Sequence, residues 1–375
     1  MSEPSSTRKP PARIIFEGVS KAYGASLAVR EVSFEIPAGS LVTLLGPSGC
    51  GKTTTLRMIA GLELPTVGRI LIGAHGDERD VSGLPAAERD VAMVFQSYAL
   101  FPHMTVLENV AYGLVVSGTA KSAAHASAKT ALATVGLQGM EVRLPSELSG
   151  GQQQRVAVAR ALVLEPSVLL FDEPLSNLDA KLRRAMREEI RALQQRLGVT
   201  VVYVTHDQEE ALAVSDHIIV MNHARIAQIG SPRALYEAPD SVFVATFMGD
   251  SSLLETTLSH DDATHGTIHL GGCRLQVAHR DIAAGDVQVS IRPEAFTLRV
   301  SSGMPSEDTQ PAGVSKDTLP GSLLRAAYLG THMEYHVQTA VGELFVKSHE
   351  VAAVFAVGDA VELLPTGRGI TVLAA

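Results

Sequence analysis

The sequence predicts an α/β domain followed by an all-β, OB-like barrel domain, and three observations support this prediction. Short apolar runs alternate with helix-favouring stretches over the first part of the chain. A glycine-rich segment, Gly46 to Thr53, follows one such run and precedes a predicted helix. After about Gly249 the chain changes to short β-like runs separated by Gly and Pro. We therefore expect a flexible tail at 1–12, an α/β domain at 13–245 and a β domain at 246–375.

Length, composition and charge are those of an ordinary globular protein. The chain has 375 residues, of which 46% are apolar, so the cores of two domains can be filled. No uncharged apolar run reaches the roughly 18 residues needed to cross a bilayer, and residues 1–12 do not resemble a signal peptide. These features predict a cytoplasmic protein. A formal net charge of −9 argues against broad nucleic-acid binding, for which a basic face is expected.

Neither the cysteines nor the histidines form a motif that predicts a metal site. The two cysteines, Cys50 and Cys273, are far apart, and Cys50 is expected to fill space in the glycine-rich segment. Two groups of histidines could be imagined as ligand sets, but no acidic or cysteine partners complete them. These groups are His332 with His336, and His260 with His265 and His269.

Strands of the first domain are predicted from short apolar runs, at 14–16, 32–34, 41–45, 91–95, 168–171 and 200–204. The last three runs have the length expected for strands buried on both faces of a parallel sheet. An alanine-rich stretch at 120–135 favours helix and predicts a helical subdomain at about 97–165. Residues 181–196 carry an apolar stripe of helical period and stop at Gly198, so their arginines are interpreted as a solvated face.

Strands of the second domain are predicted at 267–270, 287–291, 323–328, 344–346 and 370–372. A stretch at 301–322 is rich in Ser, Pro, Asp and Gly and predicts an exposed, flexible loop. The hinge between the domains is expected at 236–250, where the β/α pattern gives way to β.

The segment from Gly46 to Thr53 predicts a phosphate-binding loop. A strand, a glycine-rich loop ending in Lys and Thr, and a helix together place backbone N–H groups around an anion. Lys52 would reach the outer phosphates, and Thr53 would ligate Mg²⁺. Many nucleotide-binding enzymes share this pattern, so alone it indicates nucleotide binding only. The candidate residues are Gly46, Pro47, Ser48, Gly49, Cys50, Gly51, Lys52, Thr53 and Thr54.

A second segment, Leu148 to Gln152, predicts a further anion site. Ser149 is a candidate helix N-cap, and Gly150 and Gly151 would let a phosphate approach the backbone at the positive end of the helix. The candidate residues are Ser149, Gly150, Gly151 and Gln152. An ordinary capped helix with two turn glycines is the alternative interpretation.

Two adjacent carboxylates, Asp172 and Glu173, follow the predicted strand at 168–171. Open α/β sheets place their ligands at the carboxyl ends of their strands, and burying such a pair for structure alone would be costly. His206 follows the next strand, at 200–204, and is a candidate for contacting a γ-phosphate or orienting Glu173.

Tyr23 and Gln96 are further candidates. Tyr23 offers a flat face for stacking on adenine, and the alternative is an ordinary buried aromatic near a turn. Gln96 follows a buried strand and precedes an apolar segment at 97–102, so its amide could contact Mg²⁺ or attacking water beside a partner-facing surface. The alternative is that Gln96 caps a loop while Tyr98 and Phe101 belong to the core.

Together these residues resemble the nucleotide-binding subunits of ABC transporters. The matching set, in the order and at the spacing of the family, is Tyr23, Gly46 to Thr53, Gln96, Leu148 to Gln152, Val168 to Glu173, Asp179 and His206. The β remainder, with Ile291-Arg-Pro-Glu294, resembles the OB-like (TOBE) accessory domain of importer ATPases such as those for maltose, polyamines and ferric iron.

The resemblance implies a P-loop NTPase fold that binds ATP and Mg²⁺ and hydrolyses ATP. The residue matching Asp172 would help hold Mg²⁺, with Thr53 and Gln96, and the residue matching Glu173 would polarise the attacking water beside His206. It further implies a head-to-tail homodimer with two ATP molecules at the interface. In that dimer the phosphate loop of one subunit faces Ser149 to Gln152 of the other, and the segment Leu175 to Asp179 crosses between them. Asp179 is counted among the nucleotide-binding residues.

The resemblance also implies partners and a location. An importer ATPase would bind integral-membrane permease subunits at the cytoplasmic face of the inner membrane and act indirectly with a solute-binding protein. Polyamine, ferric iron and aminoethylphosphonate are the candidate solutes. An exporter ATPase and a non-transport ABC ATPase are the alternatives, and the β domain could also act as a regulatory module. Arg155 and Arg160 are expected in subdomain packing or dimer contacts.

Overall fold

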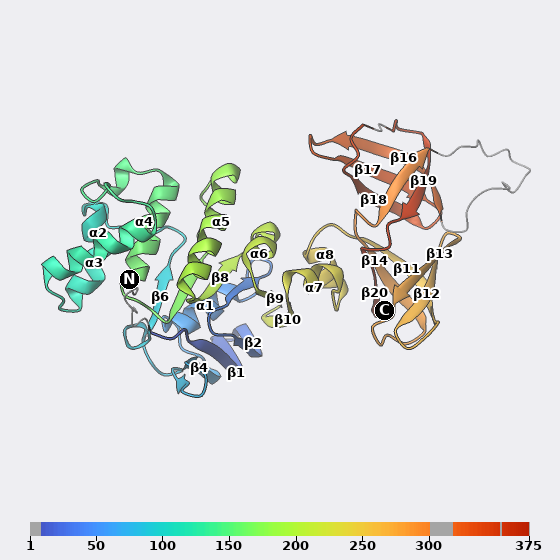
Figure 1. Cartoon of the computed structure of the whole chain (residues 1–375). Coiled ribbons are helices and arrows are strands. Elements are labelled where there is room, and N and C mark those ends of the chain that lie inside the picture. Colours follow the sequence, from blue (N-terminus) through green and yellow to red (C-terminus); the bar gives the residue numbers. More distant parts are fainter. Residues whose placement is uncertain (1–8, 301–317, 353–354, 375) are drawn as a thin grey trace, which may run out of the picture. The chain divides into compact units, whose positions relative to one another are not determined.

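The chain folds into two compact units, Met1–Pro232 and Arg233–Ala375, in a computed structural model that describes residues 9–300, 318–352 and 355–374. The first unit combines helices with two sheets, and the second is built mainly from strands (Figure 1). This architecture confirms the predicted fold class. Within the described residues, no helix has both the length and the apolar character needed to cross a membrane.

A six-stranded sheet lies at the centre of the first unit, with strand order β10-β9-β3-β8-β7-β6. Its strands are β3 (Leu41–Leu45), β6 (Val91–Val94), β7 (Val168–Asp172), β8 (Thr200–Thr205), β9 (His217–Asn222) and β10 (Arg225–Gly230). All neighbouring pairs are parallel except β9 with β10. Four of these strands match predicted apolar runs, and β3 and β8 are buried along their whole length, as expected for parallel strands covered on both faces.

A second, antiparallel sheet has the order β2-β1-β4-β5. Its strands are β1 (Arg13–Tyr23), β2 (Ser26–Ile36), β4 (Val67–Gly73) and β5 (Arg79–Asp80). Phe16 and Phe34 pair across β1 and β2 and stack with ring centroids 4.3 Å apart. The helix α1 (Lys52–Ala60) shares one hydrophobic core with this sheet and with the inner strands of the first sheet. The phosphate loop is therefore set between two rigid layers.

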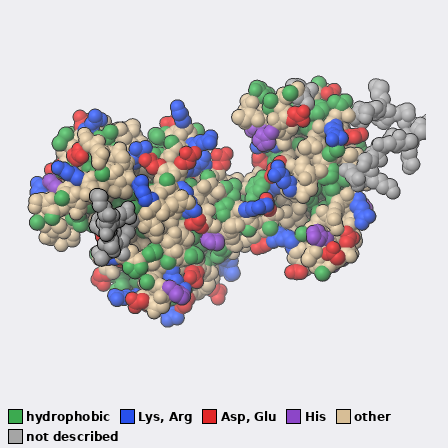
Figure 2. Space-filling view, in the orientation of Figure 1, with side chains coloured by type: hydrophobic (Ala, Val, Ile, Leu, Met, Phe, Trp, Pro, Cys, Tyr) green, Lys and Arg blue, Asp and Glu red, His purple; other side chains and the backbone are tan. Residues whose placement is uncertain are grey.

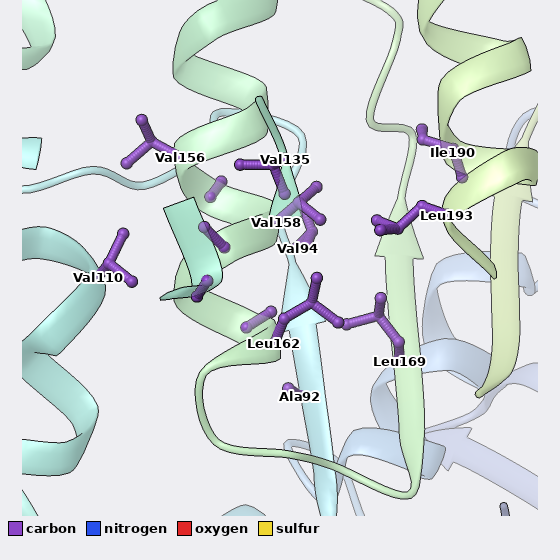
Figure 3. Close-up of a cluster of buried hydrophobic side chains, with 14 of the residues drawn as sticks. Ala92, Val94, Val110, Val135, Val156, Val158, Leu162, Leu169, Ile190 and Leu193 are labelled. Carbon is purple, nitrogen blue, oxygen red and sulfur yellow. The ribbon is translucent and has the colours of Figure 1, made fainter. Parts of the chain in front are cut away.

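The remaining helices of the first unit are α2 (Val106–Val116), α3 (Lys121–Thr134), α4 (Gly150–Leu162), α5 (Ala180–Leu197) and α6 (Gln208–Val214). The alanine-rich stretch forms α3, as predicted. The stripe of α5 buries Met186, Ile190 and Leu193, which share a core with α2, α3 and α4 (Figure 3). Over the face of the first unit seen in Figure 2, Lys and Arg side chains are interspersed with Asp and Glu.

The second unit contains two five-stranded antiparallel sheets, ordered β13-β12-β11-β14-β20 and β15-β19-β16-β17-β18, around a shared core. The strands are β11 (Ser252–His260), β12 (His265–Leu270), β13 (Cys273–Ala278), β14 (Gly285–Ile291), β15 (Phe296–Val300), β16 (Leu319–Tyr328), β17 (Met333–Thr339), β18 (Gly342–Ser348), β19 (Ala360–Pro365) and β20 (Ile370–Ala374). Each predicted strand of this domain lies within one of them.

The flexible loop predicted at 301–322 extends too far. Residues 301–317 lie outside the described residues, but β16 already begins at Leu319. Leu319 is buried and pairs with Leu363 of β19, so this end of the stretch is held by the core and by ladder hydrogen bonds. A composition rich in polar and small residues does not reveal a single anchoring leucine at its edge.

The structure also divides the chain earlier than the predicted boundary at 245/246. The predicted hinge at 236–250 contains α8 (Val242–Phe247) and the last residues of α7 (Pro232–Glu237). Both helices are tied to the β sheets by Arg292, which is only 2% exposed. Its guanidinium donates to backbone carbonyls of residues 236, 245, 249 and 250, at 2.7–3.3 Å, and lies 4.2 Å from the centre of the Tyr236 ring. The segment therefore packs as part of the second unit.

Candidate nucleotide-binding and catalytic site

The glycine-rich loop makes its turn between β3 and α1 through two positions where only glycine fits. A Cβ at Gly46 would collide with the carbonyl oxygen of Met221 and lie 2.7 Å from Cys50 Sγ. At Gly51, where φ is +106°, a Cβ would collide with the carbonyl oxygen of Ala28. The loop is thus pressed against β2 and β9 by close backbone approach, which fixes the start of α1.

The outer side of the loop is open. Gly49 has φ of +78°, and no atom lies within 4 Å of the position that its Cβ would take. The N-terminus of α1 has Gly51 as N-cap and no side-chain cap hydrogen bond. Helix amides without a capping side chain are ready donors for an anion. The loop therefore fits a phosphate group on physical grounds.

Lys52 is folded back onto the loop. Its side chain is buried, at 6% exposure, and Nζ donates to the carbonyl oxygens of Gly46 (2.7 Å) and Pro47 (3.0 Å). The ammonium group is therefore held beside the loop by two neutral acceptors. A negatively charged phosphate would be a stronger acceptor and could replace them. Cys50 is buried nearby, and burial raises the pKa of its thiol, which agrees with a space-filling role.

A hydroxyl and a carboxylate meet at the carboxyl end of β7. Thr53 Oγ1 donates to Asp172 Oδ1 at 3.5 Å. Burial, the largest effect, raises the pKa of Asp172, and the neighbouring charge of Glu173 raises it further. Oxygen ligands of this kind suit Mg²⁺, and a cation would compensate the half-buried carboxylate. This pair fits the predicted metal ligands.

Glu173 and His206 form a pair, as one of the sequence interpretations proposed. Glu173 Oε2 lies 3.1 Å from His206 Nδ1. Glu173 itself has a positive φ of +44°, a strained conformation for a residue with a side chain, and its backbone N–H donates to Val204 O at 3.0 Å. The hydrogen bond to Val204 of β8 thus fixes the backbone of Glu173, whose carboxylate contacts His206.

Gln96 is connected to Glu173 through Ser176 and also contacts Asn177, and neither residue stood out in the sequence. Its Nε2 donates to Ser176 Oγ at 3.1 Å, and Ser176 Oγ donates to the carbonyl oxygen of Glu173 at 3.1 Å. Asn177 Nδ2 donates to the carbonyl oxygen of Gln96 at 3.1 Å. The only signal for Ser176 and Asn177 was their place in the segment that ends at Asp179. Six candidates thus lie at or beyond the carboxyl ends of β3, β6, β7 and β8, on one edge of the sheet: Lys52, Thr53, Gln96, Asp172, Glu173 and His206.

The segment from Leu148 to Gln152 starts α4 with a capping box. Gln152 N–H donates to Ser149 Oγ at 3.4 Å, and Ser149 N–H donates to Gln152 Oε1 at 2.9 Å. Close packing also explains why glycine stands at these two positions, which the sequence did not reveal. A Cβ at Gly150 would lie 3.1 Å from a methyl of Leu178, and one at Gly151 would lie 3.1 Å from a methyl of Leu182. The segment therefore contacts the start of α5.

Asp179 caps α5, since its Oδ1 accepts from Leu182 N–H at 2.9 Å. The capping bond fixes where the segment from Leu175 ends and the helix begins. A nucleotide role for Asp179 stays a prediction.

Comparison with known proteins bears on these observations. The ABC transporter family matches residues 29–176, and the TOBE domain matches residues 289–373. The Fe(3+) ions import ATP-binding protein FbpC of Agrobacterium fabrum is 55% identical over 341 residues, which are 91% of this chain and 92% of that protein. The chain belongs to the ABC transporter ATPase family.

A second relative and a solved structure support the assignment of this chain to the ABC ATPases. The protein of the same name from Vibrio cholerae is 48% identical over 89% of this chain and 90% of its own length. A solved dimeric structure of the ATP-binding cassette MJ0796, in a post-hydrolysis state bound to ADP and Pi, is 31% identical with a TM-score of 0.51. It covers 59% of this chain and 99% of that cassette. Nucleotide binding and ATP hydrolysis are therefore properties of this ABC ATPase.

The exposure of Tyr23 and Tyr98 decides between interpretations that the sequence left open. Tyr23 is 48% exposed, so the interpretation as a buried aromatic is wrong, and Lys21 Nζ lies 4.9 Å from the centre of its ring. Tyr98 is 6% exposed, so it belongs to the core and not to an apolar surface segment. Phe101 is half-buried, with its ring centroid 4.7 Å from that of Tyr112. The prediction of a surface segment at 97–102 is thus wrong for Tyr98, which turns inward through a positive φ of 60°.

Arg155 and Arg160 pack the helical subdomain, as expected. Arg160 donates to the carbonyl oxygens of Tyr98 (2.8 Å) and Ala99 (2.7 Å), and Arg155 pairs with Glu189 of α5 at 2.8 Å. Arg160 therefore holds the loop after Gln96 against α4.

Proposed function

We propose that this ABC ATPase energises the import of ferric iron through separate membrane permeases. The observation that carries the proposal is the 48–55% identity to proteins named as Fe(3+) import ATP-binding proteins, over 89–97% of the chain and through both units. These relatives favour ferric iron over polyamine and aminoethylphosphonate among the expected solutes. They also favour an importer over an exporter or a non-transport ATPase.

Nucleotide binding would use the open side of the phosphate loop. Phosphate oxygens would replace the carbonyls of Gly46 and Pro47 as acceptors for Lys52 Nζ, and the loop amides would donate to them. Tyr23 would stack on the adenine. When bound, Mg²⁺ would supply positive charge beside the phosphates. Thr53, Asp172 and the side chain of Gln96 are the residues that would hold it.

Hydrolysis would depend on the pair of Glu173 and His206. The oxygen of a water molecule would form a bond to the γ-phosphorus while the bond to the ADP leaving oxygen breaks, and the proton of the water would pass to Glu173. A positioned base of this kind contributes about 10²–10⁴ in rate. Because a carboxylate only accepts hydrogen bonds, His206 donates from Nδ1 and keeps Glu173 aimed.

The site would be completed by a second copy of the chain. Gly150 and Gly151 face Leu178 and Leu182 of the same chain, and the N-terminus of α4 would form one wall of a nucleotide site whose phosphate loop belongs to another subunit. The dimeric state named for the solved cassette supports this arrangement. Two ATP molecules would then be bound head to tail, each between a phosphate loop and the segment Ser149 to Gln152 of the other subunit.

The permeases would contact the helical subdomain. Tyr112, Val115 and Val116 leave apolar surface exposed on α2, next to Phe101, and Arg160 ties this region to the loop that follows Gln96. A permease bound there would be coupled to nucleotide state through Gln96. The ATPase would be peripheral, at the cytoplasmic face of the inner membrane, and a solute-binding protein would deliver iron on the other side.

Isolation of the membrane complex with its permeases and binding protein tests this proposal. Iron-loaded binding protein should stimulate ATP hydrolysis and drive iron uptake into vesicles. The variant Lys52→Ala should lower both activities strongly, because no other cation is placed in the loop, while Lys181→Ala, an exposed lysine of α5, should lower neither. Stimulation by a polyamine-loaded protein and not by iron would refute the choice of solute. Undiminished hydrolysis by pure Lys52→Ala protein would refute the site itself.

A further inference from the structure

Arg183 of α5 lies beside the catalytic pair and has no part in the roles given above. Its Nη2 donates to the carbonyl oxygen of Leu178 at 3.1 Å. Its Nη1 donates to Asp207 Oδ2 at 3.4 Å, and its Nε lies 3.8 Å from Glu210 Oε1. One guanidinium thus contacts the segment that ends at Asp179 and two carboxylates that follow β8.

Glu210 gives this contact a firm anchor. The residue is 3% exposed, and Oε2 accepts hydrogen bonds from Tyr203 at 3.1 Å and from Thr205 at 2.8 Å. Burial raises the pKa of Glu210, and the charge of Asp207 adds to the rise, whereas Arg183 lowers it. A buried carboxylate requires a compensating cation, and Arg183 is the cation placed to provide it.

Asp207 connects the same cation to the catalytic histidine. It is the residue after His206 and the N-cap of α6, where its Oδ1 accepts from Glu210 N–H at 3.0 Å. Its other oxygen, Oδ2, is the one that accepts from Arg183. The backbone position of His206 is therefore set on one side by β8 and on the other by a carboxylate held by Arg183.

A pocket of about 50 Å³ lies between the two segments that Arg183 joins, and its walls include Glu173, His206, Arg183 and Glu210. Glu173 spans one side of this pocket through its contact with His206 at 3.1 Å. The Arg183 guanidinium forms a second link, from the carbonyl oxygen of Leu178 to Asp207, the residue after His206.

We propose that Arg183 is a positioning residue of the ATPase reaction, which passes a displacement of the segment Leu175–Asp179 to His206 and hence to Glu173. The proposal rests on the proposed function, because it takes that segment to meet the second subunit. When the subunits close, the carbonyl of Leu178 would draw the guanidinium, and Asp207 would follow with His206. Hydrolysis would then be favoured only in the closed dimer.

The variant Arg183→Gln tests the proposal in the full chain. It should lower kcat about tenfold while KM for ATP and nucleotide affinity change less than about twofold, since the side chain would act on the aim of Glu173 and not on ATP. Arg183→Lys keeps the charge but lacks the planar fork, so it should restore part of kcat. A side chain that served only to stabilise α5 would change the melting temperature without this split.

Arg184→Gln is the matched control. Arg184 neighbours Arg183 on α5, its side chain is 77% exposed, and within the described part of the chain its ion pair is with Glu188, one turn away. Its removal should leave kcat and the melting temperature unchanged. If Arg183→Gln unfolds, Asp207→Asn provides a milder variant, because asparagine can still cap α6 while the charge facing Arg183 is lost. That variant should also lower kcat at nearly constant KM.

A double-mutant cycle of Arg183→Gln with Asp207→Asn completes the test. The double variant should be little slower than Arg183→Gln alone, since both substitutions break the same connection. Wild-type kcat in Arg183→Gln, or fully additive losses in the double variant, would overturn the inference. Failure of the wild-type chain to hydrolyse ATP would refute the proposed function instead, so the two failures can be told apart.

Discussion

Asp172 brings a carboxylate into a half-buried position at the end of β7, where Thr53 is its hydrogen-bond donor. Burial raises its pKa, so the folded state without bound cation binds a proton more readily than the unfolded chain does. Above the raised pKa both states are ionised, and the ionised form costs folding free energy. The residue that suits Mg²⁺ is therefore a source of instability in its absence.

The variant Asp172→Asn should melt at a higher temperature than the wild type at neutral pH without nucleotide and Mg²⁺, although it loses activity. The difference should shrink as the pH falls through the raised pKa of Asp172 and vanish below the ordinary pKa of an aspartate, because the wild-type carboxyl is then neutral in both states. Thermal unfolding at several pH values measures this. Glu188→Gln, an exposed carboxylate of α5, serves as the control and should show no such gain. Equal melting temperatures at neutral pH would contradict the explanation.

The residues of the candidate site could be predicted from the sequence, but their contacts could not. Motif and spacing placed Glu173 and His206 at the ends of neighbouring strands, and the pair is observed. The positive φ of Glu173 was not predictable, since it depends on the hydrogen bond to Val204 of another strand. The place of Lys52 on its own loop carbonyls was hidden for the same reason, because it depends on tertiary geometry.

At the scale of elements, the contact between α4 and α5 shows that the residues of one motif can serve both packing and ligand binding. The sequence indicated Ser149 as an N-cap, which the capping box confirms. It could not indicate that Gly150 and Gly151 make room for Leu178 and Leu182, because these residues follow only after β7. The glycines bring α4 close to the segment that ends at Asp179, whether or not a phosphate also approaches them.

The second unit provides a prediction about α7 and α8. The variant Arg292→Met should lower the free energy of unfolding of this unit by about 3 kcal/mol, because one buried and two part-buried backbone carbonyls would lose their donor. Calorimetry should show a lower melting transition for the second unit, while the transition that responds to nucleotide stays in place. Arg299→Met, on the exposed side of β15, should change neither. An unchanged thermogram for Arg292→Met would contradict the role given to this arginine.

At the scale of the whole molecule, the order of two differently built units was predictable, because the change from alternating to all-β patterning is a property of long stretches. Their boundary was not, since it depends on where Arg292 attaches α7 and α8. The start of β16 depends in the same way on the buried Leu319. Single anchoring residues of this kind leave no trace in composition.

The central claim is that two chains complete each nucleotide site, and dimerisation driven by ATP tests it most directly. Closure from 1:99 to 99:1 requires ATP to bind the closed dimer about 5.5 kcal/mol better than the open form. Glu173→Gln should keep ATP binding and slow hydrolysis about 10²–10⁴-fold, so the closed state should persist. Size-exclusion chromatography of this variant should give a dimer with ATP and a monomer without it, and adding Lys52→Ala should abolish the dimer. A monomer at saturating ATP would contradict the claim.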